Sequence, residues 1–310
     1  MNYLNKNIIL HLGLNKTGST FLQKNLLSKK FTNHFVQHKG VLVSKIFEYL
    51  EIPTKEKKEG ILKTVNEIKE KNILISYEGI AGHHRNGFSD VSIKFRLLEE
   101  LFNKPKYIIF FREPSSIIYS GFYQRLQLKN DLIFEQYINR DLNNLLKNTS
   151  QKFFQTNYKV FNYNKIFEDY IKIQNRVLFI EYEKFFKEKN EDILNNFIGV
   201  SMKYNWEKRF NTPLKNLIYY EFYNHFFLFK YIKIIWLQIN RLFYRYQKAR
   251  DVSKRTVVLI DLLIKFTPKK YLEKIDHKHQ NLLEEIKNYH SKNYKDFKNK
   301  LNSSLHIFSN

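Results

Sequence analysis

The chain contains no cysteine, which excludes disulfide bridges and every zinc or iron–sulfur site that depends on thiolate ligands. This absence fits a reducing compartment. No internal repeat and no low-complexity linker interrupts the 310 residues, a length that fits one large domain, or one domain with an extension. The first apolar run, residues 8–10, leaves no room upstream for a signal peptide or a membrane anchor. The sequence therefore predicts a cytoplasmic protein.

Acidic residues are few relative to basic ones, since 53 Lys and Arg stand against 30 Asp and Glu, for a formal net charge of +23. Such a balance can indicate an anionic partner, such as a nucleic acid, a membrane surface, a sulfated glycan or an anionic cofactor. Asn, Ile, Phe and Tyr are also abundant, however. Their enrichment together with Lys is equally typical of an AT-rich coding bias, in which case the lysines only form a solvated surface layer. The hydrophobic content of 43% and aromatic content of 16% indicate a packed core rather than disorder.

Between Glu221 and Asp251 there is no acidic residue, whereas basic residues recur. At helical spacing, residues 231–246 place their apolar side chains on one face and most of the basic ones opposite. Too many charges interrupt the segment for a bilayer span. Two interpretations stay open, a helix that faces the core and a basic amphipathic helix in a membrane interface. We therefore keep peripheral contact with the inner face of the membrane through residues 217–250 as an alternative, and expect no specific nucleic acid.

The apolar runs and the helical patterns alternate along the first two thirds of the chain. The runs predicted as buried strands are residues 7–12, 72–77, 106–111 and 176–181. Helical patterns lie at 55–71 and 91–102, and another fills the tail at 272–301. This alternation indicates an α/β fold with a central parallel sheet flanked by helices. We expect a catalytic core over residues 1–215 and a helical, basic and aromatic C-terminal extension over residues 216–310 that packs on the core.

The most informative motif follows the first predicted strand. Residues 11–20 read H-L-G-L-N-K-T-G-S-T and lead into a pattern with helical spacing. A strand, a tight loop and a helix N-terminus make an anion site, because the loop amides and the helix dipole both favour negative charge. Gly13 and Gly18 have the spacing of a Walker A loop, G-x-x-x-x-G-K-[ST]. Ser19 occupies the lysine position, however, and Lys16 is the only lysine of the loop.

A second motif follows the strand predicted at residues 106–111. Arg112 comes at its carboxyl end, where ligands bind in parallel sheets, and Pro114 begins the next helical pattern. Ser120 lies about two helical turns further on. The guanidinium donors of Arg112 fit a phosphate, and the Ser120 hydroxyl could add a further hydrogen bond. A structural salt bridge explains such an arginine equally well.

Glu78 directly follows the strand predicted at residues 72–77. A carboxylate at that edge could take a proton from an acceptor hydroxyl within hydrogen-bond reach. Pairing with a neighbouring Lys or Arg is the structural alternative. His83, His84 and Arg85 come after the glycine-containing turn at residues 79–82 and either contact an acceptor or lie in a solvent-exposed loop.

Together these motifs resemble the 3′-phosphoadenosine 5′-phosphosulfate (PAPS)-dependent sulfotransferase family, and a bacterial carbohydrate-type member in particular. The family carries a K-[ST]-G-[ST]-T loop after its first strand, matched here by residues 16–20. It also carries a strand-terminal Arg with a Ser eight residues on, matched by Arg112 and Ser120. The likeness extends to a strand followed by Y-E-x-[LF], matched at residues 179–186, and covers about residues 7–215.

The resemblance implies a P-loop NTPase-like sulfotransferase fold and an enzyme that moves a sulfuryl group from PAPS to a hydroxyl or amino group, with 3′,5′-ADP as the second product. A carbohydrate or glycan is the expected acceptor. Residues 16–20 would bind the 5′-phosphosulfate, while Arg112 and Ser120 would hold the 3′-phosphate. The cofactor-binding residues implied in this way are Lys16, Thr17, Gly18, Ser19, Thr20, Arg112 and Ser120.

In the catalytic step that the resemblance implies, Lys16 stabilises charge on the bridging oxygen as the sulfuryl group leaves. Glu78 matches by position the glutamate base of the glycan-sulfating branch. The physical logic mirrors phosphoryl transfer, in which nucleophile and leaving group are aligned and the developing charge is neutralised. The family needs no metal. Phe21 is a positional candidate for stacking on the adenine.

Two other functions stay open from the residues alone. A P-loop kinase or NTPase with a degenerate loop accounts for the two glycines, but the chain lacks both G-K-[ST] and an obvious Walker B aspartate after a strand. A non-enzymatic basic protein that binds membranes or nucleic acid through residues 217–250 accounts for the charge, but it leaves the loop and Arg112 unexplained.

Overall fold

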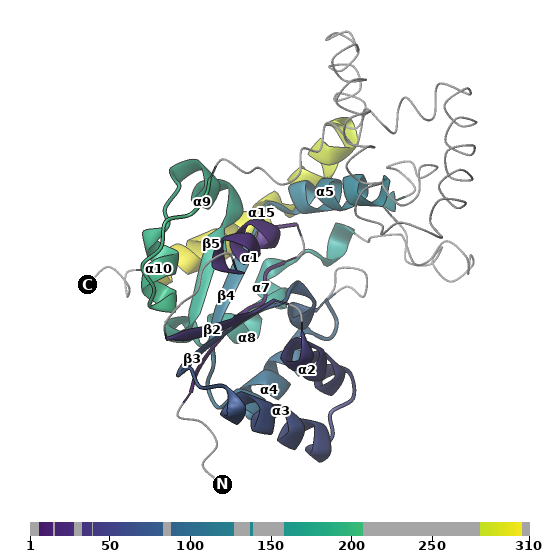
Figure 1. Ribbon diagram of the computed structural model, residues 1–310. Coiled ribbons are helices and arrows are strands. Elements are labelled where there is room, and N and C mark those ends of the chain that lie inside the picture. The colour runs from purple at the N-terminus through teal and green to yellow at the C-terminus, as the bar shows by residue number, and fades with distance from the viewer. Residues whose placement is uncertain are drawn as a thin grey trace, which may run out of the picture.

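The computed structural model has a five-stranded sheet at its centre, in the order β2-β3-β1-β4-β5, and every strand pair is parallel (Figure 1). The strands are β1 (Asn7–His11), β2 (His34–Gln37), β3 (Asn72–Ser76), β4 (Lys106–Phe111) and β5 (Val177–Glu181). The residues that the structure describes are 6–14, 16–27, 33–38, 40–82, 88–126, 137–138, 158–206 and 280–305. The predicted fold class, a parallel sheet flanked by helices, is confirmed.

Helices cover both faces of the sheet. One face packs against α1 (Ser19–Leu27), α9 (Tyr182–Glu188) and α10 (Asp192–Ile198). The cluster on the other face includes residues of α2 (Val41–Glu51), α3 (Lys55–Glu67), α4 (Val91–Phe102), α5 (Pro114–Leu126), α7 (Tyr163–Ile166), α8 (Glu168–Ile171) and α15 (Gln280–Leu305). Short 3₁₀ turns complete the connections at η1 (Glu78–Ala81), η5 (Tyr158–Val160) and η6 (Gln174–Arg176). No helix in these ranges is long and apolar enough to cross a membrane.

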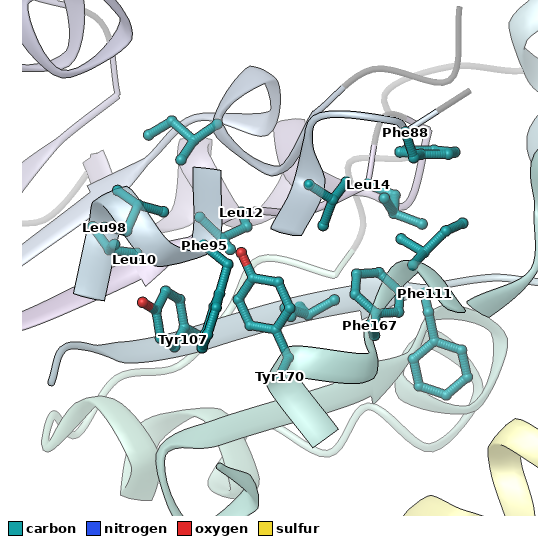
Figure 2. Packing of buried hydrophobic residues seen from close by; sticks show 14 of the residues in the cluster. Leu10, Leu12, Leu14, Phe88, Phe95, Leu98, Tyr107, Phe111, Phe167 and Tyr170 are labelled. Carbon is teal, nitrogen blue, oxygen red and sulfur yellow. The ribbon is translucent and has the colours of Figure 1, made fainter. Parts of the chain in front are cut away.

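Side chains alternate between the two faces along each strand, as the pleat requires. In β1, Ile9 joins the cluster with α1, whereas Leu10 joins the opposite cluster. In β4, Phe110 lies on the α1 side and Tyr107 on the α4 side, where it packs with Phe95 (Figure 2). Because both faces are covered, the strands are continuous apolar runs, which is typical of parallel sheets and explains why the sequence predicts them.

The C-terminal helix α15 is part of the core. It lies beside α5 in Figure 1, and the Phe297 ring is fully buried. That ring lies 5.1 Å from the ring of Phe111 and 5.7 Å from the ring of Phe179, measured between centroids. The helix predicted at residues 272–301 is therefore present from residue 280 onward. Residues 272–279, the basic segment 217–250 and the predicted boundary at residues 215–216 lie outside the described residues.

Candidate functional site

The carboxyl ends of the strands point to one edge of the sheet, where β4 continues past the end of β1 because His11 is in register with Ile108. The predicted functional residues follow these ends. His11 of β1 is in register with Ser76 of β3, and Phe111 of β4 with Glu181 of β5. The loop of residues 13–20 leaves β1, Glu78 follows β3, and Arg112 follows β4. Parallel topology therefore brings the loop and the two charged residues to the same side of the molecule.

The loop after β1 is tightly folded and leads directly into α1. Gly13 and Gly18 have φ angles of +58° and +83°, and Lys16 has a φ of +72°, an uncommon conformation for a residue with a side chain. Within the loop, the Thr17 hydroxyl donates to the Leu14 carbonyl at 2.6 Å and accepts from the Leu14 amide at 3.1 Å. This arrangement places a turn stabilised by its own side chain at the positive end of the α1 dipole.

Glu78 lies against this loop and is largely buried. The Ser19 hydroxyl, at the first residue of α1, donates a hydrogen bond to its Oε1. Gly13 is also close, because a Cβ at that position would lie 3.3 Å from Glu78 Cγ. Burial raises the pKa of Glu78 to about 7, and the positive charge of Lys16 opposes that rise. The predicted base and the predicted phosphosulfate loop are therefore neighbours.

A buried polar group around His11 and Ser76 lies beside the loop, and its residues were not predicted to be functional. His11 Nδ1 is hydrogen-bonded to Ser76 Oγ at 2.7 Å, and the Gln23 side-chain amide donates to the same oxygen at 3.2 Å. His38 Nδ1 donates to the Ser76 carbonyl at 2.9 Å. Burial and, to a lesser degree, His38 lower the pKa of His11 to about 3, so His11 is neutral at working pH. The sequence pattern that could have predicted this group is a polar residue at the end of each of two buried strands, His11 in β1 and Ser76 in β3.

Arg112 is held by the segment that follows β5. Its Nε donates to Glu183 Oε1 at 2.8 Å, and its guanidinium carbon lies 4.6 Å from the centre of the Tyr182 ring. Tyr163 fixes the backbone by donating its hydroxyl to the Arg112 carbonyl at 2.5 Å. The salt bridge that the sequence left open as an alternative is therefore present. It occupies Nε, and within the described part of the chain it leaves the two Nη groups for a ligand.

Ser120 lies on α5, half-buried, in the helix that begins directly after Arg112. The start of α5 is capped by Glu113, whose carboxylate accepts from the amides of Ser115 at 3.2 Å and Ser116 at 3.1 Å. A capped first turn fixes the direction of the helix relative to β4. Arg112 and Ser120 are thus carried by one strand–helix junction, as the sequence predicts.

Tyr182 joins the two halves of the site. A Cβ on Gly18 would lie 2.8 Å from Tyr182 Cε2 and 2.9 Å from Phe186 Cε2, so these rings pack directly on the glycine. The Arg112 guanidinium lies over the same Tyr182 ring. Tyr182 and Glu183 form the Y-E pair of the family motif, and the sequence predicts no role for either residue. Only the packing of α9 beside the loop shows that they connect Gly18 with Arg112.

The structure also bears on Phe21, on the predicted acceptor contacts and on the expectation that no metal is needed. Phe21 is buried among protein rings, with centroid distances of 4.8 Å to Phe186, 5.0 Å to Trp206 and 6.0 Å to Tyr204, so stacking on adenine would need one of these rings to move. His83, His84 and Arg85 lie outside the described residues. Among the described residues, no group of three or more His, Asp or Glu side chains could hold a metal ion.

A parallel sheet whose first strand leads through a tight glycine loop into a helix N-terminus defines the P-loop-like class of α/β proteins. Within this class the chain belongs to the sulfotransferase family, because the model described as "Sulfotransferase domain" matches residues 6–251. The chain is therefore a transferase enzyme. This membership decides against the kinase and the non-enzymatic alternatives. A search of curated protein sequences found no match.

Solved structures of sulfotransferases are similar to the chain at low identity. A sulfotransferase from Alicyclobacillus acidocaldarius has a TM-score of 0.46 and 13% identity, over 69% of this chain and 90% of that one. Mouse sulfotransferase SULT7A1 complexed with PAP has a TM-score of 0.36 and 14% identity, over 64% and 61%. The sulfotransferase domain of the Synechococcus PCC 7002 olefin synthase has a TM-score of 0.36 and 17% identity, over 66% and 77%.

Proposed function

We propose that the chain transfers a sulfuryl group from PAPS to a hydroxyl or amino group, with a carbohydrate hydroxyl as the acceptor. The sulfotransferase family generally uses PAPS, and the mouse neighbour is complexed with PAP. The observation that carries the proposal is the Tyr182 ring, which contacts both Gly18 of the loop and the Arg112 guanidinium. A cofactor with anionic groups at two ends needs two cationic or amide-lined sites that are held relative to each other.

For the 5′-phosphosulfate, the loop offers backbone amides at the N-terminus of α1 and the ammonium group of Lys16. The Thr17 hydroxyl is used within the loop, whereas Thr20 is exposed. Positive φ angles at Gly13, Lys16 and Gly18 turn the chain tightly here. Successive amides in a turn of this kind form an anion-binding concavity, so Lys16, Thr17, Gly18, Ser19 and Thr20 would hold this end of the cofactor.

For the 3′-phosphate, Arg112 offers the donors that the Glu183 pair does not use. A guanidinium fixed at Nε and stacked on Tyr182 presents its Nη groups in one orientation, which favours bidentate phosphate binding. Ser120 would add its hydroxyl from the next helix. These two residues would distinguish PAPS from nucleotides that lack a 3′-phosphate.

PAPS supplies the activated sulfuryl group and departs as 3′,5′-ADP. Glu78 takes the proton of the acceptor hydroxyl while the acceptor oxygen forms its bond to sulfur and the bond from sulfur to the bridging oxygen breaks. A pKa near 7 suits a general base at neutral pH. Lys16, whose charge already acts on Glu78, neutralises the negative charge that develops on the bridging oxygen.

A glutamate base, rather than a histidine, is what favours a carbohydrate acceptor. We place the activity in the cytoplasm, with residues 217–250 as the segment for contact with the inner face of the membrane. An enzyme that sulfates lipid-linked glycans would benefit from such a helix. His83, His84 and Arg85 remain the residues proposed to contact the acceptor.

Calorimetric titration with 3′,5′-ADP in the absence of magnesium tests the cofactor. We expect binding, and we expect Arg112→Ala to weaken it by ~1.5–3 kcal/mol, the scale of a hydrogen bond to a charged group. Arg96→Ala is the matched control, because Arg96 is an exposed arginine on α4 and its loss should leave the affinity unchanged. Preference for ATP with magnesium and no affinity for 3′,5′-ADP would contradict the proposal. Transfer of labelled sulfate to a panel of sugars then identifies the acceptor.

A further inference from the structure

The Ser19 hydroxyl is directed into the protein. Ser19 is only 3% exposed, and its Oγ donates to Glu78 Oε1. A serine hydroxyl carries one proton, so it can donate to one acceptor at a time. While the carboxylate of Glu78 holds that proton, Ser19 has no donor left for a phosphate oxygen.

The backbone of the loop does not need this hydroxyl to bind an anion. Ser19 is the first residue of α1, where the backbone amides lack partners within the helix. Thr17 shows the same division of labour, because its hydroxyl bonds to Leu14 while the chain around it turns at Lys16 and Gly18. Two of the three hydroxyls in the motif therefore serve the protein rather than a ligand.

We propose that Ser19 is a positioning residue for the base: its hydroxyl holds the Glu78 carboxylate against the cofactor loop, while its backbone amide belongs to the anion site. The inference rests on the proposed function of Glu78 and deepens it. It differs from a role of the Ser19 side chain as a phosphate ligand, which the family motif alone implies. The base is then placed by the same segment that would bind the phosphosulfate.

The surroundings of Glu78 show why such a donor is needed. Burying an ionised carboxylate is costly unless donors or opposite charges compensate for the lost water. Lys16 of the loop is the charged group that acts on Glu78. His11 from β1 is close, since both it and Glu78 lie near Gly13, but it is neutral and carries no charge to compensate the carboxylate. His38 acts on His11 rather than on Glu78. The Ser19 hydroxyl thus supplies a direct hydrogen bond to the ionised form.

The glycine at position 13 allows the base to come this close. A Cβ there would lie 3.3 Å from Glu78 Cγ and 3.7 Å from His11 Nε2, at a φ of +58°. The Glu78 side chain is therefore confined between the start of the loop at Gly13 and its end at Ser19. A base held from both sides keeps a fixed position relative to a bound sulfuryl group, which is what proton transfer in the transition state requires.

Ser19→Ala and Ser19→Thr test this proposal, the latter because it restores the hydroxyl. For Ser19→Ala we expect the 3′,5′-ADP affinity to stay within about twofold of the wild type, far less than a tenfold change, which corresponds to roughly 1.4 kcal/mol. We expect turnover to fall about tenfold or more. Loss of a donor to the ionised form raises the pKa of Glu78, so the acidic limb of the kcat/KM profile should move about one unit toward higher pH. Ser19→Thr should keep the wild-type profile.

A carbon-13 titration of the Glu78 carboxyl in the ligand-free protein gives a readout that does not depend on turnover. Glu78→Gln assigns the resonance, and Ser19→Ala should raise its midpoint by the same amount as in the rate profile. A Ser19→Ala variant with an unmoved midpoint and about a tenfold loss of 3′,5′-ADP affinity would overturn the inference and make the side chain a phosphate ligand. Wild-type protein without affinity for 3′,5′-ADP would instead overturn the proposed function, whatever the titration gives.

Discussion

At the scale of single residues, burial of Glu78 makes the folding stability of the protein depend on pH. Burial raises its pKa from 4.5 to about 7, so the folded protein binds a proton that the unfolded chain releases. The stability that this provides is fully present below pH 4.5 and is lost as the pH rises to 7 and above. The ionised carboxylate that the proposed mechanism needs is therefore the less stable form of the folded protein.

Glu78→Gln should accordingly stabilise the protein while it removes most of the turnover. The neutral amide avoids the cost of ionisation, so we expect the free energy of unfolding at pH 8 to rise by about 2–3 kcal/mol relative to the wild type, with little gain at pH 4. Urea unfolding at the two pH values measures the difference. Glu67→Gln, at an exposed position on α3, is the control and should change neither stability nor turnover. A gain that is equal at both pH values would refute a pKa origin.

The sequence is sufficient to predict which residues lie at the candidate site. It is much less informative about which other residues they contact there. Lys16, Glu78 and Arg112 each follow an apolar run, and parallel strands end at one edge, so their gathering could be predicted. The bond from Ser19 to Glu78 joins residues 59 positions apart, and the pair of Arg112 with Glu183 joins residues 71 apart. Such contacts depend on how α1 and α9 pack on the sheet, for which a local pattern carries no information.

At the scale of elements, most strands and helices could be predicted because burial on both faces leaves a clear pattern. The four predicted strands agree with β1, β3, β4 and β5 to within one residue at each end, and the helix at 91–102 is α4. The helix predicted at 55–71 ends instead at Glu67, because Ile68 is extended, with a ψ of 127°. The strand β2 was missed, since its four residues are half-buried at the edge and form no apolar run.

Two side chains of α15 stabilise the junction between β5 and α9. Glu181 is the residue before α9, and its Oε1 accepts from the Tyr294 hydroxyl at 3.0 Å and from Lys298 Nζ at 3.1 Å. The next two residues, Tyr182 and Glu183, orient Arg112. The C-terminal helix thus contacts the segment that orients Arg112 through the Glu181 carboxylate.

The double variant Tyr294→Phe/Lys298→Met should loosen this junction. We expect a loss of about 1 kcal/mol in unfolding free energy, mostly from the tyrosine hydrogen bond, because the half-exposed lysine contributes little. Affinity for 3′,5′-ADP should fall roughly threefold, since Arg112 is less well oriented, while the pH profile of kcat/KM stays fixed. Lys292→Met, exposed on the same helix, is the control. Calorimetry and urea unfolding measure both effects, and a shifted pH profile would contradict this account.

At the scale of the whole molecule, the net charge of +23 acts in opposite directions on binding and on stability. Positive charge attracts an anionic cofactor, whereas its self-repulsion destabilises the compact state. Salt screens both effects, since the Debye length falls from about 10 Å at 0.1 M to about 3 Å at 1 M. Because anionic-ligand binding and folding respond with opposite sign, they can be separated in one salt series.

Raising the salt concentration from 0.1 M to 1 M should weaken 3′,5′-ADP binding by about tenfold and raise the free energy of unfolding. Calorimetry and urea unfolding over the same series give the two slopes. Arg112→Ala should show a smaller salt dependence of affinity than the wild type, because one of the interacting cations is gone. Affinity that does not change with salt would show that the basic composition is a solvated coat without a role in cofactor binding.

The burial of Phe297 against Phe111 and Phe179 has a consequence for synthesis of the protein on the ribosome. Strands β4 and β5 emerge long before α15, and domains generally fold as units as the chain is made, at roughly 5–20 residues per second. Until residue 297 leaves the exit tunnel, Phe111 and Phe179 lack their α15 partner and are only partly covered by the rings of Tyr163 and Phe167. A nascent chain stalled before residue 280 would therefore be a substrate for chaperones rather than a small, finished sulfotransferase.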